Sequence, residues 1–316
     1  MLGLITAVVV IAVVVVVVVV ATSSSTTSPA KAASQHLTVR TVLRLPAASA
    51  VVQSGGRAWA TDDLRNLLVR FDPASGHTTA SVHLKGRPVA MVLSAGHLWV
   101  ASMVSNTVAE FDPGTLHLVR TVPVPAGPSS LAMLAGRIWV ASFTASDVTP
   151  IDPATGAVGS SVPIAVGAVR LAAGFGALWV TGNTDQLTQL GVGPAGTTTG
   201  PQKVITVGQV PIGIATGAGS VWVANSASGT VTRLNPKTLQ VIHTYRPGGD
   251  PLALAVAGGR VWLADGTAQH LRTIFPGGGL PPVSLGSSPR QVISAGDRVW
   301  VATANPGRVL AVQAAG

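Results

Sequence analysis

The chain contains no cysteine, one tyrosine and one glutamate among its 316 residues. Without cysteine no disulfide can form and no thiolate can act as a nucleophile, so stability must come from a packed core. Aromatic residues make up 4% of the chain and no basic run is interleaved with them, which argues against a nucleic-acid-binding surface. A metal needs three or four converging ligands, and the few carboxylates do not form such a set. We therefore expect no metal, no cofactor and no nucleic-acid partner.

The motifs of common enzyme classes are absent as well. The sequence has no Gly-x-Ser-x-Gly elbow, no phosphate-binding Gly-Lys-Ser/Thr and no His-Glu-x-x-His. The single glutamate, Glu110, stands in a strand-like run, where we expect it to face solvent. From the residues alone we assign no catalytic residue.

What the chain has instead is a regular spacing of tryptophan. Successive tryptophans are 40, 40, 40, 43, 40 and 38 residues apart, and none lies outside the series. A fixed period of this length indicates repeats that bury their apolar faces against neighbouring repeats. The seven are Trp59, Trp99, Trp139, Trp179, Trp222, Trp262 and Trp300.

Each repeat has the pattern of four short β-strands. In the second repeat the runs 88–94, 97–102, 107–111 and 118–124 are rich in β-branched residues and are separated by Gly, Asp-Pro and Ser/Asn clusters. Asp or Asn followed by Pro stands 13 residues after four of the tryptophans, where its side chain can cap a turn. Four-stranded units of about 40 residues with a tryptophan signature predict an all-β, seven-bladed β-propeller of antiparallel blades.

The two ends of the repeat region predict how the ring closes. After Trp300 there is room for the tryptophan strand and one more, residues 308–313, so the last blade lacks its outermost strand. Before Trp59 stands a surplus strand, residues 37–45, which resembles the outer strand 118–124. We expect this N-terminal strand to complete the last blade, which gives one propeller domain over residues 37–316.

Residues 1–21 form an almost unbroken apolar run dominated by valine. About 20 such residues span a bilayer, whereas the apolar core of a cleavable signal has about 7–15 residues. We expect a transmembrane anchor or uncleaved signal helix here, followed by a flexible Ser/Thr/Ala linker over residues 22–36. A buried helix is the alternative, but an all-β propeller offers no place for it. The expected location is the cell membrane, single-pass, with the propeller outside the cytoplasm, or secretion if the segment is cleaved.

The formal net charge is +9, and sixteen of the twenty basic residues are arginine. Abundant Arg, Ala, Gly and Val are typical of a GC-rich bacterium. A positive domain beside a membrane favours anionic neighbours. As partners we expect the membrane, through the N-terminal helix, and an anionic cell-envelope polymer or another envelope protein.

Two sets of loops meet at one face of such a propeller, around the mouth of its channel. One set joins each outer strand to the next inner strand, and the other follows each tryptophan strand. Asp62, Asn225 and Asp265 each stand three residues after a tryptophan, as repeated hairpin-turn residues would. The candidate ligand-binding residues are Arg87, Arg170, Asp250, Arg290 and Gln291 from the first set, with Asp265 and His270 from the second. The stronger candidates are those that break the small, apolar pattern of their repeat positions, namely Arg87, Arg170, Arg290 and Gln291.

At the opposite face, five of the seven repeats carry a basic or potentially basic residue two positions before the tryptophan. They are Arg57, His97, Arg137, Arg260 and Arg298. A partial ring of positive charge would attract an anion. The alternative is that these long side chains cover the neighbouring blade and hydrogen-bond to turn carbonyls.

The fifth repeat suggests a family. Gly219-Ser-Val-Trp-Val-Ala-Asn225 with Gly229-Thr-Val-Thr-Arg-Leu-Asn-Pro-Lys-Thr238 resembles the repeat of bacterial extracytoplasmic propellers of the YVTN and streptogramin (virginiamycin B) lyase-like type. The resemblance covers all seven repeats and implies the same fold. Lyases of this type open an ester-linked ring with a metal, His and Glu, and Glu is common after the tryptophan strand, where this chain has Ser, Asn, Asp, Gly or Thr. We therefore expect a binding or scaffolding module without catalysis, with a lyase-like or lactonase-like enzyme acting at the channel mouth as the alternative.

Overall fold

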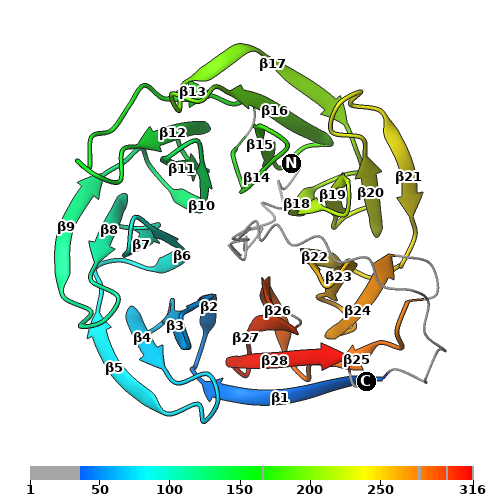
Figure 1. Ribbon diagram of the computed structural model, residues 1–316. Coiled ribbons are helices and arrows are strands. Elements are labelled where there is room, and N and C mark those ends of the chain that lie inside the picture. Colours follow the sequence, from blue (N-terminus) through cyan, green and yellow to red (C-terminus); the bar gives the residue numbers. More distant parts are fainter. Residues whose placement is uncertain (1–35, 166, 276–278, 297, 315–316) are drawn as a thin grey trace, which may run out of the picture.

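Seven four-stranded antiparallel sheets are arranged radially around a central axis in the computed structural model (Figure 1). The structure describes residues 36–165, 167–275, 279–296 and 298–314. These ranges hold 28 strands, and no helix within them is long and apolar enough to cross a membrane. The seven-bladed propeller predicted from the tryptophan spacing is confirmed. The expected membrane helix over residues 1–21 and the linker up to residue 35 lie outside the described residues.

The four strands of a blade follow one another outward from the axis, so each sheet is a simple meander. Blade 1 consists of β2 (Ala48–Ser54), β3 (Arg57–Asp62), β4 (Leu67–Phe71) and β5 (Thr78–His83). Blade 2 consists of β6 (Pro88–Ser94), β7 (His97–Ser102), β8 (Thr107–Phe111) and β9 (Leu118–Pro123). Blade 3 consists of β10 (Pro128–Leu134), β11 (Arg137–Ser142), β12 (Asp147–Ile151) and β13 (Val162–Pro163).

The remaining blades repeat this order, except that the last one takes its outer strand from the start of the chain. Blade 4 consists of β14 (Arg170–Gly174), β15 (Ala177–Thr181), β16 (Gln186–Val192) and β17 (Thr198–Thr206). Blade 5 consists of β18 (Pro211–Gly217), β19 (Ser220–Asn225), β20 (Thr230–Leu234) and β21 (Val241–Tyr245). Blade 6 consists of β22 (Pro251–Ala257), β23 (Arg260–Asp265), β24 (His270–Phe275) and β25 (Val283–Ser284). Blade 7 consists of β26 (Ser288–Ala295), β27 (Arg298–Ala304), β28 (Arg308–Ala314) and β1 (Leu37–Arg44).

The ring closes as the sequence predicts, because β1 pairs antiparallel with β28. The pairing runs from Leu37 opposite Ala314 to Arg44 opposite Arg308, with one irregularity between Thr41 and Leu43. Both ends of the described chain therefore lie in one blade (Figure 1). An outer strand supplied from the far end of the sequence leaves no incomplete blade in the ring.

An arginine on β1 also joins blade 7 to blade 1. Arg40 donates from Nη1 to the carbonyl of Ala74 at 2.6 Å and from Nη2 to that of Pro73 at 2.9 Å. Arg120 on β9 makes the corresponding contact between blades 2 and 3, donating to the carbonyl of Ala154 at 3.3 Å. The repeated Val-Arg-Thr-Val segment of the two outer strands thus places a guanidinium on the next blade's Asp-Pro turn.

The tryptophans are the main packing groups between blades. All seven are at most 3% exposed, as expected for residues at one repeat position between adjacent sheets. Trp99, for example, packs in one cluster with Leu131 and Ile138 of the next blade. Five of the seven indole nitrogens donate hydrogen bonds, in two ways, whereas those of Trp99 and Trp300 have no partner among the described residues. Trp59 Nε1 donates to the carbonyl of Pro113 in the next blade at 3.1 Å, whereas the indoles of blades 3 to 6 donate to the carbonyl five residues earlier.

The Asp-Pro turns have the predicted side-chain caps. Asp72 Oδ1 accepts hydrogen bonds from the backbone amides of Ala74 and Ser75. Asp112 and Asp152 do the same, and Asn235 replaces them in blade 5. Because these bonds favour the ionised carboxylate, they hold the pKa values of the three aspartates below the ordinary 3.8.

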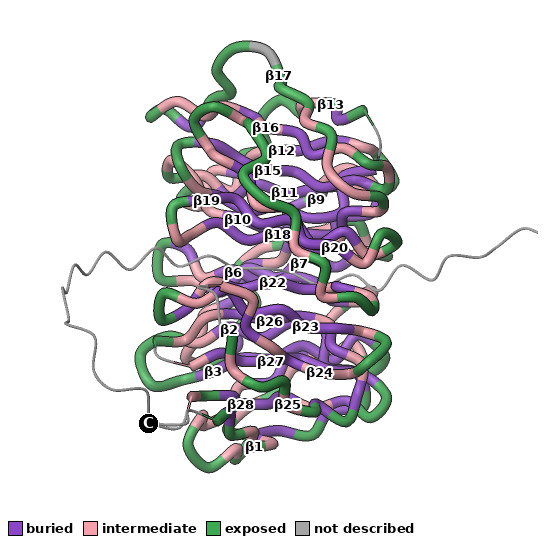
Figure 2. The backbone as a smooth tube through the Cα atoms, turned by 90° about the vertical axis from the view of Figure 1, so that its right-hand side faces the viewer, coloured by how far each residue is buried: buried purple, intermediate pink, exposed green. Residues whose placement is uncertain are grey.

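The meander defines two faces. We call the face with the loops that follow β3 and the corresponding tryptophan strands the mouth face, and the face with the turns that precede them the corner face. Figure 2 shows buried strands in the interior of the disc and exposed turns along both faces. The first residue of β1 lies at the corner face, because Leu37 pairs with Ala314 while the neighbouring Gln313 pairs with Arg298.

Candidate functional site

A cavity of about 690 Å³ opens at the mouth face over blades 4 to 7. We call it the mouth cavity. Its wall contains Val169, Ile212, Leu252 and Arg290, which are equivalent residues ten positions before the tryptophans of these four blades. Its polar rim comes from the loops and consists of Asn183, Ser226, Asp250, Thr267, Ser288 and Asn305. Two of the residues expected at the channel mouth, Asp250 and Arg290, therefore line a real cavity.

Arg290 is held in place by an aspartate that the sequence did not single out. Asp63 Oδ2 lies 3.3 Å from Arg290 Nη1 and 3.1 Å from Arg87 Nε, and the Asp63 side chain is buried. Two of the stronger sequence candidates thus meet on one carboxylate, which joins loops of blades 1, 2 and 7. Arg87 is not part of the cavity wall. The sequence did contain a signal for Asp63, because the other six blades have an uncharged residue at its repeat position.

Arg170 and Gln291 occupy one repeat position, nine residues before their tryptophans, and both are fully buried. Burial is the main cause that lowers the pKa of Arg170 well below its usual value, and the positive charge of Arg290 adds to it. Gln291 Oε1 accepts a hydrogen bond from the Val51 amide at 2.6 Å. Gln291 Nε2 is buried and has no hydrogen-bond partner among the described residues. Neither Arg170 nor Gln291 lines the mouth cavity.

The Asp250 carboxylate points toward the loop of blade 5. Its Oδ1 accepts a short hydrogen bond from the Ser226 hydroxyl, and its backbone amide donates to Asp265 Oδ1 at 3.3 Å. Both Ser226 and Asp250 line the mouth cavity, whereas Asp265 does not.

Asp265 acts as a turn residue. Its Oδ1 accepts from the Ala268 amide at 2.9 Å, and its Oδ2 lies 3.6 Å from Arg272 Nη2. His270 is paired with Asp265 across β23 and β24 and is half-buried, outside the mouth cavity. Among the described residues no group of three or more His, Asp or Glu side chains is placed to hold a metal ion.

The other residues three positions after a tryptophan also serve their hairpins. Asp62 Oδ1 accepts from the amides of Leu64 and Arg65, and Asn225 Nδ2 donates to the hydroxyls of Thr230 and Thr232. The interpretation of this position as hairpin-turn chemistry is confirmed.

At the corner face, two members of the expected basic ring are engaged by carboxylates of their own blade. His97 Nδ1 lies 2.8 Å from Glu110 Oε1, and Arg137 forms an ion pair with Asp152. Glu110 also lies 2.5 Å from Arg120 Nε. The expectation that Glu110 faces solvent is wrong: its side chain is 1% exposed and contacts both Arg120 and His97.

The remaining ring members, Arg57, Arg260 and Arg298, occupy the equivalent corners of blades 1, 6 and 7. Arg57 is exposed, while Arg260 and Arg298 are partly buried. The ring therefore exists as a placement of residues, and its members in blades 2 and 3 contact carboxylates.

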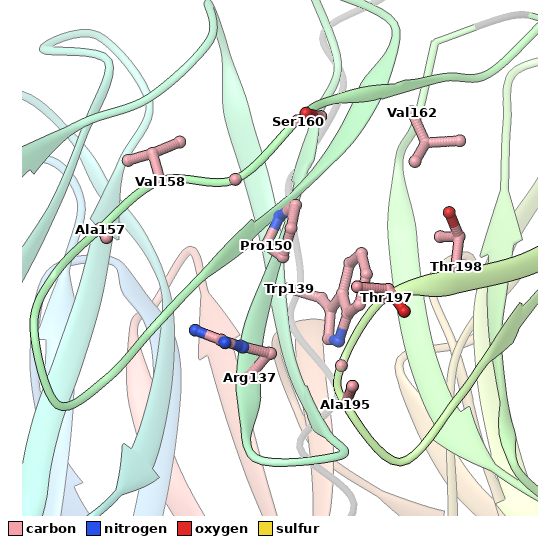
Figure 3. A pocket seen from close by; sticks show the side chains of 12 residues that line it. Arg137, Trp139, Pro150, Ala157, Val158, Ser160, Val162, Ala195, Thr197 and Thr198 are labelled. Carbon is pink, nitrogen blue, oxygen red and sulfur yellow. The ribbon is translucent and has the colours of Figure 1, made fainter.

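A second, smaller cavity of about 270 Å³ lies between blades 3 and 4 near the corner face (Figure 3). Trp139 and Pro150 line it from blade 3, and Ala195 and Thr197 line it from blade 4. Pro150 has no amide hydrogen, so it cannot donate to the neighbouring strand. Its carbonyl accepts from the Gly159 amide, and β13 is only two residues long. In blade 3 the residue opposite the tryptophan is Pro150, whereas blades 1 and 5 have the longer side chains of Arg70 and Arg233 at this position. The cavity lies where such a long side chain is missing.

Comparison with known proteins shows similarity of fold. No protein-family model and no curated protein matches the chain. A virginiamycin B lyase from Staphylococcus aureus superposes with a TM-score of 0.76 at 14% sequence identity, over 88% of this chain and 99% of the lyase. A streptogramin B lyase gives 0.77 at 16% identity, over 88% and 98%. The WD40 repeats of RRP9 give 0.76 at 10% identity, over 88% and 97%. Enzymes and repeat domains of the WD40 type are thus equally similar to this propeller.

Proposed function

We propose that this protein is a binding module of the bacterial cell envelope, tethered to the membrane by its N-terminal segment and without catalytic activity. The mouth cavity is its ligand site. The observation that carries this proposal is the asymmetry of the cavity. Four blades share one repeat position in its wall, yet only blade 7 places a charged residue, Arg290, there, and Asp63 holds that residue in place. A volume of about 690 Å³ is within the range of about 300–1,000 Å³ typical of small-molecule sites.

A ligand screen with a blocked cavity tests this function. Compounds that raise the melting temperature of the protein are retested on Leu252→Trp, which fills the mouth cavity, and on Val104→Trp. Val104 is an exposed residue of the mouth face outside the cavity. We expect stabilisation to disappear in Leu252→Trp and to persist in Val104→Trp. Compounds that stabilise all three proteins equally would place binding elsewhere.

The tethered arrangement is supported by the position of β1. The described chain begins at the corner face, which also carries the basic ring, because Leu37 pairs with Ala314 on β28 and the adjacent Gln313 pairs with Arg298. A tether joined to this end would turn the corner face toward the membrane. A membrane, an anionic wall polymer or another envelope protein would then face this ring, while the mouth cavity faces away.

Vesicle binding by residues 36–316, which include every strand of the closed ring, tests the charged face. We expect binding to vesicles with anionic lipid that weakens as salt rises, since exposed charges are screened over about 8 Å at physiological ionic strength. Replacing Arg57, Arg137, Arg260 and Arg298 together by Gln should remove it. Replacing Arg65 and Lys85 of the mouth face should not. Salt-independent binding, or none, would favour a packing role for the ring.

The alternative function is a streptogramin-lyase-like or lactonase-like enzyme, which the likeness to two lyases favours. The placement of Asp265 and His270 argues against an enzyme. Asp265 caps a turn and contacts Arg272, and neither Asp265 nor His270 lines the mouth cavity. We expect no turnover of streptogramin B or simple lactones with added divalent metal. Turnover that is lost in His270→Ala would make the enzyme the better interpretation.

A further inference from the structure

We propose that the mouth cavity selects ligands that carry a single carboxylate on an apolar body. This inference rests on the proposed function, and it adds the chemical class of the ligand. It follows from the guanidinium of Arg290 and from its contrast with the apolar residues at the equivalent wall positions.

The cavity wall carries a guanidinium. Arg290 lines the cavity with a side chain that is 16% exposed, so its guanidinium can reach a bound molecule. It contacts Asp63 through Nη1, and a guanidinium has five N–H donors in all, so a carboxylate can bind beside that contact.

The charges around Arg290 favour an anion. Arg87 and Arg290 share one oxygen of Asp63, so two guanidiniums are balanced by one carboxylate. Arg170 is fully buried, and its pKa is lowered first by burial and second by the positive charge of Arg290. A guanidinium does not lose its proton in proteins. A negative group bound beside Arg290 would reduce the repulsion between these two cations.

The charged residues of the lining and the apolar wall determine which anion fits. Of the described residues that line the cavity, Arg290 is the one cation and Asp250 the one anion. One cationic partner matches a monoanion better than a phosphate dianion. A carboxylate also matches the planar guanidinium in geometry. The equivalent positions of blades 4 to 6 are Val169, Ile212 and Leu252, which offer an apolar surface to the rest of the molecule.

The test uses the full chain in detergent and matched pairs of probes. Each aliphatic or aromatic carboxylate, from hexanoate to decanoate and from benzoate to naphthoate, is compared by calorimetry with its uncharged primary amide. We expect the carboxylates to bind about ten- to hundredfold more tightly than the amides, as one charge-assisted contact allows. We expect Arg290→Gln to remove that preference and Leu252→Ala to weaken both members of a pair.

Arg65→Gln is the matched control, since Arg65 is an exposed arginine of the mouth face that lies outside the cavity wall. It should leave the preference for carboxylates within about twofold. Equal binding of acids and amides, blocked by Leu252→Trp, would overturn the inference and leave the proposed function standing. Failure of every carboxylate to bind, or a preference that survives Arg290→Gln, would also overturn it. Tighter binding of inorganic phosphate than of any carboxylate would assign the donors to a different anion.

Discussion

Thr38 and Gln313 lie 275 residues apart in the sequence, yet they face each other across β1 and β28, and the Thr38 hydroxyl donates to the Gln313 carbonyl at 3.4 Å. The last blade is complete only when the N-terminal strand is present. Deleting residues 37–45 should therefore sharply lower the melting temperature and the cooperativity of unfolding, because it exposes the edge of β28. Deleting residues 1–34 should leave both nearly unchanged. Equal melting of the two truncations, measured by calorimetry, would contradict closure through β1.

The tryptophan spacing and the strand pattern of the repeats predicted the fold, and the surplus N-terminal strand together with the truncated last repeat predicted its closure. The candidate site was predicted less completely. Arg87, Arg290 and Asp63 all depart from the pattern of their repeat positions, but their contact could not be predicted, because Arg290 approaches Asp63 only after blade 7 closes against blade 1. Glu110 was placed wrongly for a related reason. Its neutralising partners are on two other strands, so its own strand gives no sign of burial.

Trp139→Ala should destabilise the propeller by about 3–5 kcal/mol, the usual range for truncating a buried aromatic side chain. The indole is 1% exposed and packs with Leu171 and Leu178 of blade 4. Chemical denaturation at constant m-value measures the change. Trp139→Phe, which keeps an aromatic ring beside the existing cavity, is the control and should lose less. A loss of under about 1 kcal/mol in Trp139→Ala would mean that this blade contact is not a principal source of stability.

Glu110→Gln should destabilise the protein by about 1–3 kcal/mol, because it leaves His97 and Arg120 without the buried carboxylate they share. The loss stays below that of a fully buried pair since both basic side chains are about one-third exposed. His97→Gln, which removes only one of the two partners, should lose less than Glu110→Gln. If Glu110→Gln is as stable as the wild type in urea at low salt, the ion pairs do not stabilise blade 2.

The Asp-Pro turns should make the propeller sensitive to acid. Amide hydrogen bonds, with that from Ser75 or Thr115 the largest, lower the pKa values of Asp72 and Asp112 below 3.8 in the folded state. Their stabilising contribution is present above 3.8 and is lost as the pH falls through the lower folded values. The double variant Asp72→Asn/Asp112→Asn should lose less stability than the wild type between about pH 4 and pH 2.

Blade 5 supplies the reciprocal control for this prediction. Asn235 Oδ1 accepts the same two amide bonds without a charge, from Lys237 and Thr238. Asn235→Asp should therefore add acid sensitivity to a turn that lacks it. Identical pH profiles for the wild type and both variants, measured as urea midpoints, would show that these turns do not control acid unfolding.

Asp147 should have the opposite effect on the pH dependence of stability. Burial in blade 3 raises its pKa above 3.8, and hydroxyl hydrogen bonds, including that from Thr149 at 3.4 Å, offset only part of this. With a folded pKa above the unfolded one, the ionised side chain opposes folding. The penalty is absent below the unfolded value, appears as the pH rises through the folded value and is complete above it. Asp147→Asn should thus be more stable than the wild type at pH 7, and the gain should shrink toward pH 3. Asn keeps the size of the side chain and an acceptor for Thr149. A gain in stability that is independent of pH would therefore have to come from packing. A loss of stability at pH 7 would show that the carboxylate stabilises β12.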